Sequence, residues 1–211
     1  MTIDSKEMLK NILDYLSQIE YIRPNEIPNI DLYMDQVTTF MDSHLSSSKR
    51  HSEDKILTKT MINNYAKNKL LPPPNKKKYS KEHLLVMIFI YYFKGILSIT
   101  DIQALMNPIT EKFFNSGEDF NIESIYNEVF SLEKRQAEKL TKDIVDKYNT
   151  SKCTFAEAKK DQEFLQLFSF ICMLSFDVYV KKLLIEKLID EMRSSRQSTE
   201  ESDKEEKKNK K

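Results

Sequence analysis

The residues with the clearest potential for chemistry lie in the stretch NKLLPPPNKKKYSKEHLL, residues 68–85. Three consecutive lysines, Lys76, Lys77 and Lys78, follow three prolines and an asparagine, and Tyr79 comes directly after them. Ammonium groups in a row can lie along a phosphate backbone, where each neutralised phosphate releases counterions and makes binding salt-dependent. Polyproline is a stiff spacer, so the lysines should have a defined position. The stretch therefore predicts a short extended arm that binds an anionic partner.

The charge distribution along the chain supports this reading. The 211 residues include 33 Lys and Arg against 33 Asp and Glu, so the net charge is zero. Residues 49–82 nevertheless hold ten basic and three acidic side chains, whereas residues 1–48 hold three basic and eight acidic ones. A local excess of one sign is the quantity that matters for an anionic partner. The neutral total hides a basic segment.

The sequence before the prolines, TKTMINNYAKNKLL, predicts a helix that starts at residue 58. Threonine is a good N-cap, and the apolar residues repeat at helical spacing. Asparagine can read adenine in the major groove, and threonine can bind phosphates or bases. The alternative is that these side chains are ordinary helix surface and that the lysines only keep a loop soluble. The polar positions of this helix are Thr58, Lys59, Thr60, Asn63, Asn64 and Lys67.

Enzyme chemistry finds no support in the residue pattern. The chain has two glycines, Gly95 and Gly117, so a Gly-rich phosphate loop is excluded. The three histidines fall in different elements, and Cys153 and Cys172 lack metal-ligand spacing. Cys172 lies between apolar neighbours and is expected in the core. We expect no catalytic residue, no metal and no cofactor.

The composition predicts an all-α protein. Only 2 glycines in 211 residues, with many Lys, Glu, Leu and Ile, favour helices over antiparallel sheet. The apolar run Leu84–Phe93 predicts a central core helix that starts after Ser80 and stops at Gly95, while Pro108 should end the next helix. The other expected helices span residues 5–20, 31–45, 99–106, 122–148 and 154–192.

The C-terminal third contains an apolar run that has to be considered as a membrane span. The run 164–180 is 17 residues long and contains Gln166 and Asp177, which is short and polar for a bilayer span. A buried hairpin or a dimer helix is the better interpretation. The opening MTIDSKEMLK has no apolar signal segment, so a cytoplasmic protein is expected. Residues 193–211 contain no apolar side chain and should form a disordered charged tail whose removal leaves folding unchanged.

The basic segment also resembles known proteins. Residues 58–106 are similar to the winged helix-turn-helix of MerR-type regulators, in which a recognition helix is followed by a basic wing and a leucine-bearing helix. The chain is closer still to the bacterial domain-of-unknown-function family 1836, through DLYMDQ, LTKTMINNY and KKYSKEHL over about residues 20–192. The positions that match the MerR pattern are Tyr65, Leu70, Leu71, Pro72, Lys78, Tyr79, Ser80, Leu84, Leu97, Ser98, Ile99 and Ile102.

The resemblance implies a fold and a function. It implies an N-terminal helix and linker over 1–30, a winged helix-turn-helix with a small β wing over 31–110, a helical dimerisation or effector region over 111–192, and the tail. It also implies a transcription regulator that binds double-stranded DNA through the polar positions given above with Tyr65, Lys76–Lys78 and Tyr79, and that forms a homodimer through residues 121–192. No effector is identified.

Two departures and one alternative accompany this prediction. The MerR pattern usually has an arginine where Asn63 stands, and the loop at residues 46–57 is long for a helix-turn-helix, so phosphate contacts are better supported than base reading. The alternative function is a protein-interaction module that uses the same basic face on an acidic partner.

Overall fold

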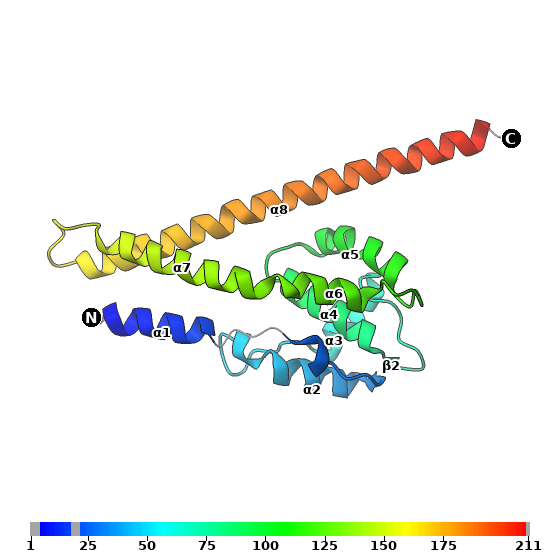
Figure 1. The fold of residues 1–211 in the computed structure, drawn as a ribbon, viewed down its shortest axis with the longest axis horizontal. Helices are drawn as coiled ribbons and strands as arrows, with labels where there is room; N and C mark the ends of the chain where they lie inside the picture. The colour runs from blue at the N-terminus through cyan, green and yellow to red at the C-terminus, as the bar shows by residue number, and fades with distance from the viewer. Residues whose placement is uncertain (1–4, 18–21, 210–211) are drawn as a thin grey trace.

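The computed structural model describes residues 5–17 and 22–209. The described chain is mostly helical and has one two-stranded sheet, which confirms the all-α prediction (Figure 1). The last three positions of the helix predicted over 5–20 lie outside the described residues. The α-helices are α1 Ser5–Ser17, α2 Met34–His44, α3 Lys59–Lys67, α4 Lys81–Phe93, α5 Ile99–Phe113, α6 Ile122–Ser131, α7 Glu133–Lys152 and α8 Gln162–Asn209. Two short 3-10 helices, η1 Pro24–Glu26 and η2 Ser46–Ser48, complete the helical elements.

The sheet joins two segments that are far apart in sequence. Strand β1, Leu32–Tyr33, pairs antiparallel with β2, Lys78–Tyr79, so that Leu32 faces Tyr79. The helix predicted from residue 31 therefore starts three residues later, at Met34. The backbone of Tyr33 is extended, and its N–H donates to Gln36 Oε1 at 2.9 Å, which closes the first turn of α2.

Helix α4 is the centre of the molecule, as predicted. Eight consecutive residues, His83–Ile90, are buried, and α5, α6 and β2 pack around the helix. A helix that is apolar on all sides is stable only when it is enclosed in this way. The helix ends at Phe93, two residues before Gly95.

Helix α5 continues through Pro108 to Phe113, so the prediction that proline ends it is wrong. A proline inside a helix costs about 3 kcal/mol through the lost hydrogen bond and the ring clash. The helix continues because residues on both sides of Pro108 pack on the core, with Met106 buried and Ile109 and Phe113 partly buried against it. Here the free energy gained from tertiary packing exceeds the local cost of a proline inside the helix.

The boundaries of the C-terminal helices also differ from prediction. The helix expected over 122–148 is interrupted at Leu132, where α6 ends and α7 begins, and α7 then continues past residue 148 to Lys152. Helix α8 starts at Gln162 rather than near residue 154, because a loop with Phe155 at φ 55° precedes it.

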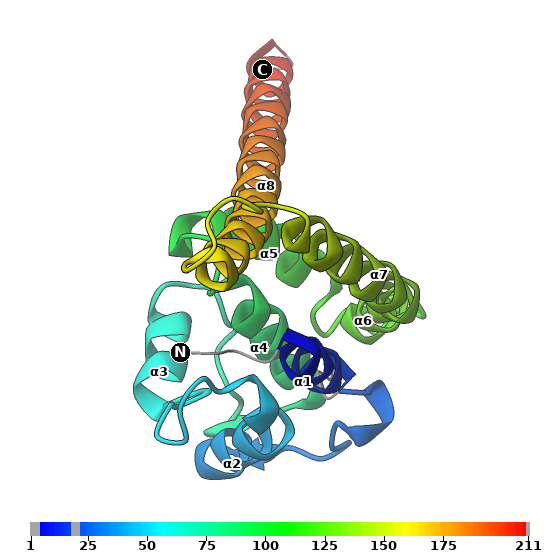
Figure 2. The ribbon, with the colours of Figure 1, turned by 90° about the vertical axis from the view of Figure 1, so that its left-hand side faces the viewer.

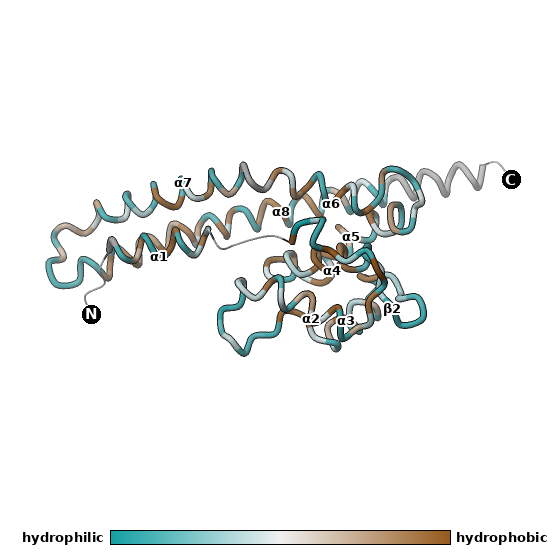
Figure 3. Tube along the Cα trace, turned by 60° about the horizontal axis from the view of Figure 1, so that its bottom comes forward, coloured by the Kyte–Doolittle hydropathy of each residue, from teal (hydrophilic) through white to brown (hydrophobic). Residues whose placement is uncertain are grey.

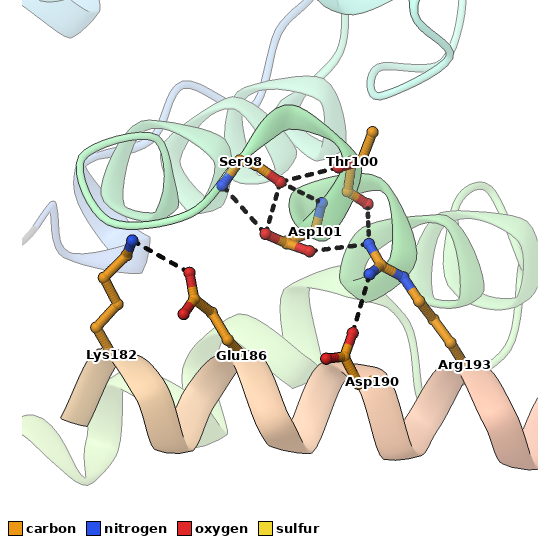
Figure 4. Close-up of polar contacts among 7 residues, drawn as sticks. All are labelled: Ser98, Thr100, Asp101, Lys182, Glu186, Asp190 and Arg193. Atoms are coloured by element: carbon orange, nitrogen blue, oxygen red, sulfur yellow. Dashed lines mark hydrogen bonds and ion pairs between the residues drawn. The ribbon is translucent and has the colours of Figure 1, made fainter. Parts of the chain in front are cut away.

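Residues 193–209 of the expected disordered tail belong to α8, and residues 210–211 lie outside the described residues. Extending an existing helix avoids the cost of nucleation, and Glu, Lys and Gln are good helix formers, so this charged segment needs no core. Arg193 also joins α8 to α5: its guanidinium donates to the Thr100 carbonyl at 2.8 Å and to Asp101 Oδ1 at 2.9 Å (Figure 4). Ser98 caps α5 by accepting from the Asp101 N–H at 3.1 Å.

The buried side chains form two separate cores. The first includes Ile22, runs through α2–α6 to Tyr126, and receives Ile189 from α8. The second consists of Ile144, Tyr148 and Phe170 on α7 and α8, with α1 packed against them. The N-terminal helix therefore lies beside the C-terminal hairpin, while residues 22–30 pack with the first core (Figure 1).

No helix among the described residues is long and apolar enough to cross a membrane.

Candidate nucleic-acid interface

Helix α3 presents one apolar and one polar face. Thr58 is its N-cap, as predicted, and its hydroxyl accepts from the Met61 N–H at 3.1 Å. Ile62 and Tyr65 are buried in the first core. The exposed polar side chains of α3 are Lys59, Thr60, Asn63, Asn64 and Lys67.

The end of α3 fixes the direction of the chain that follows. Lys69 adopts φ 56°, and the N–H groups of Lys69 and Leu70 donate to the carbonyls of Ala66 (3.1 Å) and Tyr65 (2.8 Å). These are the two bonds of a Schellman motif, in which glycine usually holds the left-handed position. Leu70 and Leu71 are then buried, so the three prolines start from an anchored point.

The three lysines lie in a tight turn and not in an extended arm, which corrects the prediction. Asn75 and Lys78 exchange both backbone hydrogen bonds, at 3.1 and 2.9 Å. Lys76 and Lys77 between them have φ 48° and 65°. Positive φ at both central residues is typical of a type I′ hairpin turn, which favours Asn-Gly. Lysine in the left-handed region costs roughly 1 kcal/mol, so this turn holds two charged side chains at the expense of stability.

Contacts with the start of α2 bring α3 and the lysine turn together. Lys59, the first residue of α3, forms an ion pair with Asp35. The Lys78 ammonium lies 5.2 Å from the centre of the Tyr33 ring. Tyr33 and Asp35 are two residues apart, so Lys59 and Lys78 lie near one end of α2 although 19 positions separate them in sequence. We call the exposed polar side of α3 together with the lysine turn the basic face.

His83 is a buried side chain that contacts the backbone on both sides of the lysine turn. Its Nδ1 accepts from the Ser80 N–H at 3.0 Å, and its Nε2 lies 3.4 Å from the Pro73 carbonyl. This pattern fits a neutral imidazole that carries its proton on Nε2. The side chain is 4 % exposed, and burial lowers its pKa from the ordinary value. His83 is therefore a buried link between the prolines and α4.

The predicted site residues divide by exposure. Seven are exposed, and Thr58 and Lys78 are half-buried. Tyr65 and Tyr79 are 5 % and 3 % exposed, and burial raises the pKa of both hydroxyls. These two tyrosines pack the core beneath the basic face and do not line it. The exposed seven are Lys59, Thr60, Asn63, Asn64, Lys67, Lys76 and Lys77.

Sequence reasoning missed three residues of this surface. Asp35 places a carboxylate beside Lys59, and Tyr33 lies under Lys78, but no spacing in the sequence relates positions 33 and 35 to positions 78 and 59. Lys69 is exposed next to α3, but the sequence indicates only its charge. The sequence signal for Lys69 is its position two residues after the last residue of α3, because a residue with positive φ often follows the end of a helix.

Other chemistry is not assembled in the part of the chain that the structure describes. Within residues 5–17 and 22–209 no three His, Cys, Asp or Glu side chains are placed to hold a metal ion. An open hollow between α2 and the loop before α3 is lined by mixed charges, and Lys49 pairs with Asp42 there at 2.7 Å. Both cysteines are exposed, so the prediction that Cys172 packs in the core is wrong.

One comparison with known proteins gives a match. The model of a family described as a domain of unknown function (DUF1836) matches residues 22–129, which is half of the chain and ends well before the predicted limit at residue 192. No curated protein and no solved structure matches the chain. The matched residues include every buried member of the first core except Ile189, and they carry the whole basic face.

Proposed function

We propose that this chain, which belongs to the DUF1836 family, binds double-stranded DNA through its basic face and acts as a transcription regulator. In this proposal residues 31–110 act as a winged helix-turn-helix of the MerR type, with α2 and α3 as the two helices and the lysine turn as the wing. The observation that carries the proposal is the joining of α3 and the turn at one end of α2.

Helix α3 has the properties that a major-groove helix requires. Its nine residues span about 13 Å, and its outward side chains are hydroxyl, amide and ammonium groups. Asn63 or Asn64 could bind an adenine edge, while Thr60 and Lys67 are suited to phosphates or bases. Its apolar face is fully used by the core, so nothing apolar on α3 has to be covered by the DNA.

The lysine turn has the properties of a phosphate contact. Lys76 and Lys77 are exposed at the tip of a hairpin whose two ends are held by β2 and by the anchored prolines. A rigid turn loses little conformational freedom on binding. Phosphate contacts fix the register of a protein on the duplex and carry no sequence information. The turn should therefore supply affinity, and α3 any sequence preference.

Asp35 opposes an anionic partner at the basic face. Its pair with Lys59 is largely exposed on both sides, and such pairs contribute only about 0–1 kcal/mol. A phosphate can therefore replace the carboxylate at Lys59. Asp35→Asn should strengthen duplex binding if Lys59 contacts the backbone.

The test measures duplex binding at several salt concentrations. Lys76→Asn/Lys77→Gly/Lys78→Gln removes three charges and places Asn-Gly, which the turn prefers, at its centre. We expect the slope of log K against log salt to fall by about 2–3 and binding to weaken equally on all sequences. The matched control is Lys142→Gln/Lys159→Gln/Lys160→Gln, which removes the same charge from exposed positions far from the basic face.

A second pair of variants separates base reading from general affinity. Asn63→Ala and Asn64→Ala should each alter the preference among sequences by about 1–3 kcal/mol at one base pair while non-specific binding stays constant. Equal loss on every sequence would remove the base-reading role. If the unaltered chain does not bind duplex at low salt but binds a polyglutamate peptide, the basic face is instead a protein-interaction site.

A further inference from the structure

Helix α8 has an exposed apolar side that nothing in the described chain covers. The other helices lie on one side of α8, with α7 along its first part and α5 along its second (Figure 2). Apolar residues nevertheless recur around the helix (Figure 3). Phe164 and Phe176 are each 66 % exposed. Contiguous apolar surface of this kind on a water-exposed helix marks an interaction site.

The exposed apolar residues follow a regular order. Every fourth residue of α8 from position 164 to position 188 is exposed and apolar, and the row has three members on each side of Phe176. Ile171, Tyr179 and Leu183 are also exposed and widen the row at its centre. The row consists of Phe164, Phe168, Cys172, Phe176, Val180, Leu184 and Leu188.

A row at i, i+4 spacing forms a ridge that is inclined to the helix axis. Two such ridges pack into each other's grooves when the helices cross at about 50°. In an antiparallel pair centred on Phe176, Cys172 of one helix lies near Val180 of the other, and Phe168 lies near Leu184. The symmetry of the row thus makes it complementary to itself, which is the requirement for a two-fold interface.

We propose that a second copy of this chain covers the row, with two α8 helices packed antiparallel about an axis at Phe176. In each chain the other helices lie on one side of α8 (Figure 2). In the dimer, the remaining helices of the two chains therefore lie on opposite sides of the pair of α8 helices. The members near the centre of the row form the interface, and Phe164 and Leu188 lie at its rim. The dimer does not depend on the basic face or on DNA.

The charges of α8 favour the antiparallel over the parallel arrangement. A parallel pair places Lys181 and Lys182 against their own copies, and like charges in contact are unfavourable. The antiparallel pair places Lys181 opposite the exposed Ile171, so its ammonium group can extend to solvent over apolar surface.

The exposed area is sufficient for a dimer. A phenylalanine buries about 150–250 Å² in full, so each of the exposed rings offers roughly 100 Å² or more. The row and its three neighbours together approach the about 800 Å² that each partner contributes to a standard interface. The apolar centre without charges also has the composition of such interfaces.

The first test is the mass of the full chain in solution, measured by sedimentation equilibrium over a range of concentrations. We expect twice the 25.0 kDa of one chain. Phe176→Glu should raise the dissociation constant about 100-fold or more, since each dimer loses two central side chains. Phe120→Glu changes a similarly exposed phenylalanine outside α8 and should leave the mass unchanged. A monomer at about 100 µM would overturn the proposal.

The second test locates the axis. In the Cys153→Ser/Cys172→Ser chain, Phe176→Cys should form a disulfide between copies on mild oxidation, because only a residue at the axis meets its own copy. Cys172 in the Cys153→Ser chain should not cross-link, since its copies lie eight residues apart along the helices. Efficient cross-linking through Cys172 would show a parallel pair and overturn the proposed arrangement.

Discussion

The two cores of this molecule differ in how completely they are closed. In the first core, α4 is surrounded on all sides and contributes eight consecutive buried residues. In the second core, α1, α7 and α8 bury three residues well and leave a long apolar side of α8 exposed. A closed core stabilises one chain by itself, whereas an open one reaches full burial only with a partner.

The two candidate binding surfaces, the basic face and the apolar row on α8, are divided between the two cores. The closed unit carries the basic face and coincides with the family match, while the open unit lies outside the match and carries the apolar row. The comparison indicates that the two surfaces can be altered independently, since they lie on different cores. The four predictions that follow test this difference between the cores, from the largest effect to the smallest.

Truncation of a core isoleucine should show the contrast directly. Ile88→Ala in the first core should lower the free energy of unfolding by about 2–5 kcal/mol, because the fully buried site leaves a cavity. Ile144→Ala in the second core, where the side chain is 8 % exposed, should cost less because the site can collapse or admit water. Urea unfolding at one protein concentration measures both. Equal losses would contradict the proposed difference in closure.

A buried hydrogen bond ties the start of the matched region to α6. The Tyr126 hydroxyl donates to the Ile22 carbonyl at 2.6 Å, and both residues are buried. Tyr126→Phe leaves that carbonyl unsatisfied and should cost about 1–2 kcal/mol in urea unfolding. Tyr15→Phe, on an exposed tyrosine of α1, is the control and should change stability by less than about 0.5 kcal/mol.

The first core should also respond to pH through His83. Burial lowers the pKa of this imidazole in the folded chain, so the unfolded chain binds a proton first as pH falls. The stability that His83 contributes is complete above its ordinary pKa of about 6.5 and decreases as pH falls toward the lowered value. Unfolding at pH 7.5 and pH 5.5 should show a difference that His83→Gln reduces. His51→Gln, at an exposed position, should not reduce it.

The C-terminal part of α8 should matter least. Removing residues 198–211 leaves Arg193 and its contacts in place and should change stability by less than about 0.5 kcal/mol. Removing residues 193–211 also breaks the link from Arg193 to Thr100 and Asp101, so it should cost measurably more. Thermal unfolding of the two truncated chains distinguishes these outcomes. Identical midpoints would show that the Arg193 link contributes nothing.

Local patterns predicted most of the helices and their starts. Thr58, Ser80 and Ser98 stand at the N-caps that their residue types indicate, and the apolar run after Ser80 became the central helix. The errors at Pro108 and in the charged tail have one cause. Both predictions assumed that the residues at one position end a helix. Packing against a core, or continuation from an existing helix, can extend the helix past such residues.

The candidate site was predictable only in part. The sequence identified the lysines and the polar side of α3, because charge and helical spacing are local properties. It could not show that Tyr65 and Tyr79 are buried, since burial depends on which elements meet. Nor could it show the hairpin turn, because Lys76 and Lys77 are not residues that a left-handed turn favours.

The sequence alone determined the helical class, the basic segment and the apolar run within α8, which all follow from residue type and order along the chain. Only the tertiary structure decided that β2 pairs with β1, that Lys59 and Lys78 lie at one end of α2, and that the row on α8 faces away from its own chain. The physical reason is distance in sequence. Local periodicity fixes which side of a helix is apolar, but contacts between distant elements fix what that side touches.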